Sequence, residues 1–125
     1  MNTPVVYEAP RGIGVAGLEA SILDAFHQLR DAVTGGRAAV VIVRDSDLLG
    51  HGDPADAALA NGLLGLVRAF ATEGVREGWV VNILAVDEGA DDATRRGWVE
   101  RLSDPQGVVG ALIRVGPLHL GRVPV

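Results

Sequence analysis

Hydrophobic residues along the chain form two alternating kinds of run. One kind is short, continuous and rich in β-branched residues, as at 38–43 and 79–86. Runs without a polar alternation are typical of strands that are covered on both faces of a parallel sheet. Similar but shorter runs at 4–8 and 110–115 predict two further strands.

The other kind of run repeats its apolar residues every three or four positions, which predicts helices. Helices are expected over three ranges: 18–33, 54–73 and 91–102. Gly35 and Gly36 are suited to end the first helix, because glycine adopts the left-handed conformation of a C-terminal cap. Asp53 and Pro54 are suited to begin the second, as the N-cap and the first helical residue.

Strands that alternate with helices predict an α/β fold with an open parallel sheet of about four strands, flanking helices and right-handed crossovers. Between the second strand and the second helix, residues 44–53 are polar and are expected to form a loop. We find no linker or internal repeat, so residues 1–125 are interpreted as a single domain.

Composition excludes several classes of function. The net charge is -5, which disfavours nucleic acid as a partner. The sequence has no cysteine, and His27, His51 and His119 are too scattered to predict a metal site. No apolar run is long enough to cross a membrane, so we expect a cytoplasmic protein. All eleven basic residues are arginine, so the chain has no lysine.

Several motifs, in order, resemble the short-chain dehydrogenase/reductase family. The helical segment Gly62–Glu73 resembles the helix that follows that family's catalytic residues, and Val80–Ile83 resembles its next strand. The segments Leu102–Asp104 and Gly110–Gly116 resemble the family's C-terminal signature. Order and approximate spacing agree over residues 37–120. The resemblance implies a truncated Rossmann-like fold.

The N-terminal turn, Tyr7–Gly14, also resembles the family's cofactor turn. Gly12, Gly14 and Gly17 are therefore candidate cofactor-binding residues. Two alignments remain open for the helix at 18–33. It corresponds either to the family's first helix or to the helix just before the strand at 38–43. In both alignments the strands that hold the adenosine are missing.

The resemblance implies a reaction that this chain lacks the residues to perform. Family members use a tyrosine as the proton donor and a lysine one helical turn later. The matching positions hold Asp56 and Ala60, and Tyr7, the only tyrosine, lies on the first predicted strand. An aspartate is ionised at neutral pH and is a poor proton donor.

Cofactor binding is disfavoured by other departures from the family's pattern. Glu8 brings a negative charge to the cofactor turn, and Pro10 removes an N–H donor. Val86–Asp87 replaces the Pro-Gly pair that lies beside the nicotinamide in the family. We therefore expect no NAD(P).

Remnants of a cleft support a different hypothesis. Ser46 matches the family's serine, and His51, Asp56 and Asn82 complete a set of candidate catalytic residues for another class of enzyme. A third hypothesis is a module that binds nicotinamide nucleotides without chemistry. Local roles as loop, helix-start or core residues compete with each of these assignments.

Assembly is the function that the retained segments favour. In the family, the helices flanking the serine strand form a four-helix bundle between subunits, and the last strand and C-terminal tail form a second interface. The predicted interface residues are small or apolar: Ala58, Gly62, Gly65, Ala69, Leu118 and Leu120. We expect a non-catalytic homo-oligomer, or a hetero-oligomer with a full-length family reductase.

Overall fold

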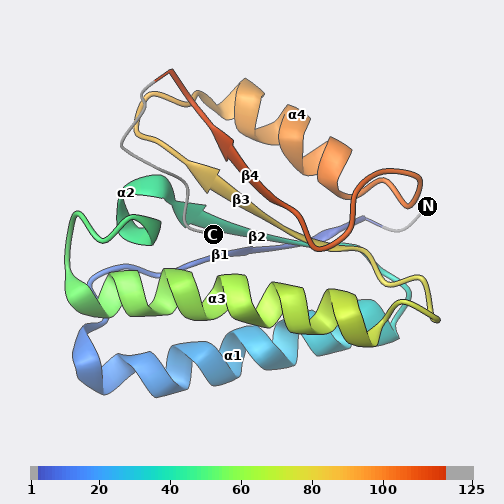
Figure 1. Ribbon diagram of the computed structural model, residues 1–125, viewed down its shortest axis with the longest axis horizontal. Helices are drawn as coiled ribbons and strands as arrows, with labels where there is room; N and C mark the ends of the chain where they lie inside the picture. Colours follow the sequence, from blue (N-terminus) through green and yellow to red (C-terminus); the bar gives the residue numbers. More distant parts are fainter. Residues whose placement is uncertain (1–2, 118–125) are drawn as a thin grey trace.

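The computed structural model describes residues 3–117 and has one parallel sheet of four strands in the order β1-β2-β3-β4 (Figure 1). Each strand lies beside the strand that precedes it in the chain. The strands are β1 (Val5–Glu8), β2 (Ala39–Arg44), β3 (Val81–Val86) and β4 (Leu112–Val115). This arrangement confirms the predicted α/β fold class.

Four helices accompany the strands: α1 (Gly14–Thr34), α2 (Asp45–Leu48), α3 (Pro54–Glu73) and α4 (Asp92–Leu102). Asp53 caps α3 as predicted, because its carboxylate accepts hydrogen bonds from the N–H groups of Ala55 and Asp56. Two predictions need correction. The first helix begins at Gly14 rather than at residue 18, and the loop predicted at 44–53 contains the short helix α2.

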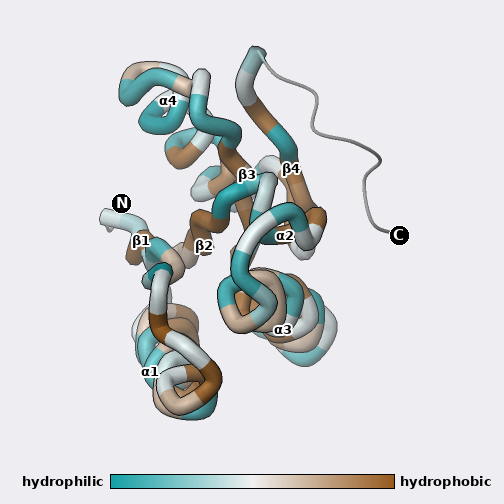
Figure 2. Tube along the Cα trace, turned by 90° about the vertical axis from the view of Figure 1, so that its left-hand side faces the viewer, coloured by the Kyte–Doolittle hydropathy of each residue, from teal (hydrophilic) through white to brown (hydrophobic). Residues whose placement is uncertain are grey.

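The helices cover opposite faces of the sheet (Figure 2). Leu29 of α1 and Leu59, Leu63 and Val67 of α3 pack with the odd-numbered residues of β2 and β3. Leu102 of α4 packs with the even-numbered residues of the same strands. Both faces of the two central strands are therefore buried, as their unbroken apolar sequences indicate.

The prediction of right-handed crossovers is wrong for the last strand. The first two crossovers pass through α1 and α3 on one face, and both are right-handed. The third crossover passes through α4 on the other face, while the strand order continues in the same direction. The link from β3 to β4 is therefore left-handed, an arrangement found in only about 2% of such connections.

The outer edge of β1 is protected against pairing with another strand. The N–H groups of Val5 and Ala9 donate to β2, so Val6 and Glu8 direct theirs outward. The next residues in this alternation are Pro4 and Pro10, which have no N–H. Prolines and charges at such positions discourage the addition of a further strand.

Direct pairing of β1 with β2 also bears on the alignment of α1. In a doubly wound sheet, the first strand of the second half lies beside the first strand of the chain and would separate it from β2. Here Val5 pairs directly with Ala39. The sheet therefore favours the alignment in which α1 corresponds to the helix just before the serine strand.

Asn82 is buried within β3 and links three segments of the chain. Its amide nitrogen donates to the carbonyls of Leu102 and Val108, each at 2.8 Å. Its carbonyl oxygen accepts from the N–H of Ala111 at 2.9 Å. Asn82 thus fastens the end of α4 and the loop before β4 to the sheet, which is a structural role.

We predict that Asn82→Leu destabilises the protein by about 3 kcal/mol, because it leaves several buried backbone groups without partners. Urea unfolding followed by circular dichroism measures the change. Gln28→Leu on the exposed side of α1 is the control, expected to shift stability by no more than about 0.5 kcal/mol. Equal stability of the two variants would contradict the assigned role.

Candidate functional site at the carboxyl ends of the strands

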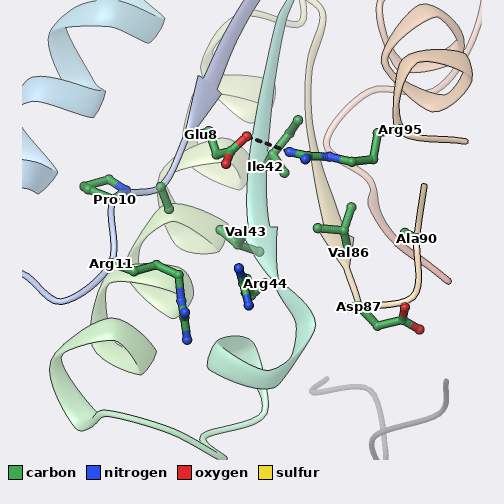
Figure 3. A pocket seen from close by; sticks show the side chains of 11 residues that line it. Glu8, Pro10, Arg11, Ile42, Val43, Arg44, Val86, Asp87, Ala90 and Arg95 are labelled. Carbon is green, nitrogen blue, oxygen red and sulfur yellow. Dashed lines mark hydrogen bonds and ion pairs between the residues drawn. The ribbon is translucent and has the colours of Figure 1, made fainter. Parts of the chain in front are cut away.

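A cavity of about 410 Å³ lies at the carboxyl ends of β1, β2 and β3 (Figure 3). Ligands of open α/β sheets bind at this edge, so the cavity is the natural candidate site. Its charged lining residues come from the strand ends and from α4: Glu8, Arg11, Arg44, Asp87 and Arg95.

Arg11 is held rigidly at one side of the cavity by Asp47. Its Nε lies 2.8 Å from Asp47 Oδ2, and its Nη2 lies 3.2 Å from Oδ1. The Asp47 side chain is only 5% exposed. Hydrogen bonding to this carboxylate raises the pKa of Arg11, and the charge of Asp47 adds to the effect. The pair ties the loop after β1 to α2.

Asp45 and Arg114 form a second bidentate ion pair. Arg114 Nε lies 2.7 Å from Asp45 Oδ1, and Nη2 lies 2.6 Å from Oδ2. Hydrogen bonding to Asp45 raises the pKa of Arg114, and both side chains are largely buried. Because β3 lies between β2 and β4, the pair spans the sheet from the start of α2 to the last strand.

Asp56 and Ala60 occupy the positions that the resemblance assigns to tyrosine and lysine. Asp56 is buried, and its Oδ1 accepts a hydrogen bond of 2.9 Å from the Gly12 N–H. Ala60 is buried in the hydrophobic core. Neither residue lines the cavity. The Asp56 carboxylate therefore holds the loop before α1 in place.

Tyr7 also lies outside the cavity lining. Its hydroxyl donates to the Ser21 carbonyl at 3.3 Å, on the side of the sheet that faces α1. Burial raises the pKa of Tyr7, and the charge of Asp24 raises it further. The lysine of the resembled family lowers the pKa of its tyrosine, so the environment of Tyr7 acts in the opposite direction.

The other predicted catalytic residues do not form a constellation. Ser46 lies half-buried in α2, and His51 lies exposed in the following loop. Within residues 3–117, no hydrogen bond joins the side chains of Ser46, His51 and Asp56. Asn82 lies near the amino end of β3, whereas the cavity lies at the carboxyl ends of the strands.

Residues 3–117 contain no group of three metal-ligating side chains and no helix that could cross a membrane.

The glycine turn is partly occupied by groups of the chain itself. Gly12 and Gly14 adopt φ values of 71° and 65°, but the Gly12 N–H is already bound by Asp56. Pro10 offers no N–H, and Glu8 adds a second carboxylate to the turn. Gly17 lies within α1, where an added Cβ would come within 3.1 Å of Ile13. A side chain at this position would therefore crowd Ile13 in the first turn of that helix.

The sequence analysis did not identify most of the charged residues at the carboxyl ends of the strands as site residues. Asp45 and Asp87 directly follow β2 and β3, and a carboxylate at the end of a buried strand is a signal that was available. Their partners gave no signal, because Arg114 lies 69 residues from Asp45. Arg95 is only 29% exposed and reaches Glu8 across the sheet.

Comparison with known proteins gives one curated relative and several solved structures. The relative is the (2S)-[(R)-hydroxy(phenyl)methyl]succinyl-CoA dehydrogenase subunit BbsC of Thauera aromatica, 34% identical over 107 residues. The match covers 82% of this chain but 42% of the relative, so the chain spans less than half of that protein's length. No protein-family model matches.

Solved reductases share the fold. A promiscuous reductase, LugOII, that catalyses keto-reduction at C1 during lugdunomycin biosynthesis is similar with a TM-score of 0.63 and 18% identity. The match covers 92% of this chain and 56% of that one. A dehydrogenase/reductase from Sinorhizobium meliloti 1021 is similar with a TM-score of 0.59 and 18% identity, over 92% and 60% of the two chains.

We predict that Arg114→Leu destabilises the protein by about 3 kcal/mol, because it leaves Asp45 buried without its cation. Arg44→Leu is the matched control. Its partner Glu88 is exposed, so the expected change is at most about 1 kcal/mol. Urea unfolding of both variants checks the difference, and similar losses would show that burial of the Asp45 pair is unimportant.

Proposed function

Because the chain belongs to the short-chain dehydrogenase/reductase family, we propose that it acts as a non-catalytic family subunit through association with a second chain of the same fold. The partner is either another copy or a full-length reductase. The observation that carries the proposal is the placement of Asp56 and Ala60. Both are buried away from the cavity, where a proton donor and its cation would have to act.

The proposal includes the absence of nicotinamide chemistry. The chain has no lysine, and Tyr7 has a raised pKa. At the turn before α1, the Asp56 carboxylate occupies the N–H of Gly12. These groups oppose a bound pyrophosphate through charge and through the loss of donors.

An exposed apolar surface on α1 and α3 supports association. The two helices lie side by side, and no described element covers the side that faces away from the sheet (Figure 2). Val15, Leu23 and Phe26 of α1 are 83%, 51% and 37% exposed. We call this surface, with the exposed Ala58 and Ala69 of α3, the outer helix face. Apolar surfaces of this kind mark contacts with other proteins.

Two glycines of α3 that were predicted at the interface, Gly62 and Gly65, have different surroundings. An added Cβ at Gly62 would come within 2.9 Å of Ile22 in α1, so this glycine allows the two helices to pack closely. Gly65 has no neighbour within 4 Å of that position and leaves room for a partner helix. Leu118 and Leu120, also predicted at an interface, lie outside the described residues.

Two further observations favour helix packing over strand addition. Pro4 and Pro10 protect the outer edge of β1, so a partner gains little from pairing there. The relative from Thauera aromatica is named as a subunit of a dehydrogenase. A chain with the same two helices would complete a four-helix bundle over the outer helix face.

We predict that the purified protein is dimeric or larger at low micromolar concentration, and that Leu23→Glu shifts it toward monomer by placing a charge on the outer helix face. Light scattering coupled to size-exclusion chromatography measures the mass. Val75→Glu is the control, because Val75 is 73% exposed but lies in the turn after α3. A wild-type monomer that also fails to co-purify with a family reductase from its native source would overturn the proposal.

Calorimetric titration with NADH and with NADPH tests the cofactor part of the proposal. We predict no saturable heat with either nucleotide, because the carboxylates of Glu8 and Asp56 lie at the turn before α1 and Asp56 already accepts the Gly12 N–H. A dinucleotide-binding reductase of the same fold is the positive control. Stoichiometric binding to this chain would refute this part alone.

A further inference from the structure

Arg44 and Arg95 at the cavity each bind an exposed carboxylate through one hydrogen bond, whereas Arg11 binds a buried one through two. Arg44 Nη1 lies 3.4 Å from Glu88 Oε1, and the Glu88 side chain is 73% exposed. Arg95 Nη2 lies 2.6 Å from Glu8 Oε1, and the Glu8 side chain is 65% exposed. Exposed pairs of this kind contribute little to stability, so their arginines are available to another anion.

Arg44 and Arg95 differ from Arg11 in the number of guanidinium N–H groups that remain without a carboxylate partner. A guanidinium has five N–H donors in a planar fork that matches the two oxygens of a carboxylate or phosphate. Within residues 3–117, Arg44 and Arg95 each make one hydrogen bond through that fork. Arg11, by contrast, already binds Asp47 at two points.

The cations that line the cavity are all arginines, which bind oxyanions through their N–H groups. Arg11, Arg44 and Arg95 line it, against the two carboxylates of Glu8 and Asp87. Asp87 is buried, its Oδ1 accepts from the Gly89 N–H at 2.8 Å, and its carboxylate is turned away from the arginines (Figure 3). Asp47, Glu88 and Glu8 balance the three arginines, so an anion binds here by displacing an exposed carboxylate, Glu8 or Glu88.

We propose that the cavity binds a small molecule through an oxyanion, a carboxylate or a phosphate, held between Arg44 and Arg95. Glu8 takes the place of the ligand's oxyanion when the site is empty, and the ligand displaces it from Arg95. The cavity volume of about 410 Å³ suits a small metabolite. This site is independent of the proposed assembly, because it lies at the strand ends and not on the outer helix face.

Calorimetric titration of the full chain, with inorganic phosphate in one arm and succinate in the other, tests the site. Sodium chloride keeps the ionic strength constant, because screening weakens non-specific binding. We expect saturable binding in at least one arm. Arg44→Gln and Arg95→Gln should each weaken it about tenfold, the loss of one charge-assisted hydrogen bond. Glu8→Gln should tighten binding several-fold, because it removes the competing carboxylate.

Arg76→Gln is the matched control, since it removes the same charge from an exposed residue outside the cavity. It should leave the affinity unchanged. Saturation by phosphate alone, succinate alone or both identifies the oxyanion. The proposal is overturned if neither anion saturates, or if Arg44→Gln and Arg95→Gln weaken binding no more than Arg76→Gln. Light scattering on the same samples keeps failure of assembly separate from failure of the site.

Discussion

Buried carboxylates at the carboxyl ends of the strands hold this edge of the molecule together. Asp45 binds Arg114, Asp47 binds Arg11, and Asp56 binds the N–H of Gly12. A carboxylate removed from water is stable only when a cation or N–H donors compensate for its lost hydration. Each pairing joins segments far apart in the sequence, so together they fix the loop before α1, the helix α2 and the last strand. Most polar groups at the carboxyl ends of the strands therefore stabilise the fold. Arg44, Arg95 and Glu8 are the charged residues there that can exchange their partners.

Most of the fold could be predicted because its elements follow from local sequence. The apolar runs of β2 and β3 are long enough to identify buried strands, and the N-cap Asp53 marks the start of α3. The hand of the last crossover could not be predicted in this way. It depends on the face that α4 covers, which is decided by packing of its half-buried and buried residues, such as Trp98 and Leu102, on the even-numbered strand residues. The low hydrophobicity of this helix gave no indication of that choice.

The site was predictable only in part, for a similar reason. Sequence position alone showed that Asp56 and Ala60 replace a proton donor and a cation, and that Glu8 brings a charge to the strand end. It could not show which carboxylate meets which arginine, because those contacts depend on the register of the sheet and on the face from which α4 approaches. Asn82 illustrates the difference. Its position near a motif suggested chemistry, whereas its three hydrogen bonds show a structural link between β3 and its neighbours.

The strand order has a consequence for how the chain folds. Since every strand pairs with its immediate predecessor, each β-α-β unit can form as soon as its own residues have left the ribosome, without waiting for a distant partner. Each pairing still spans a crossover helix, but none requires a later strand to insert between two strands that are already paired. The left-handed connection to β4 comes last in this sequence, and the Asp45–Arg114 pair can form only then. Synthesis from amino to carboxyl terminus would therefore add these four strands one at a time, and this ion pair would form after the last of them.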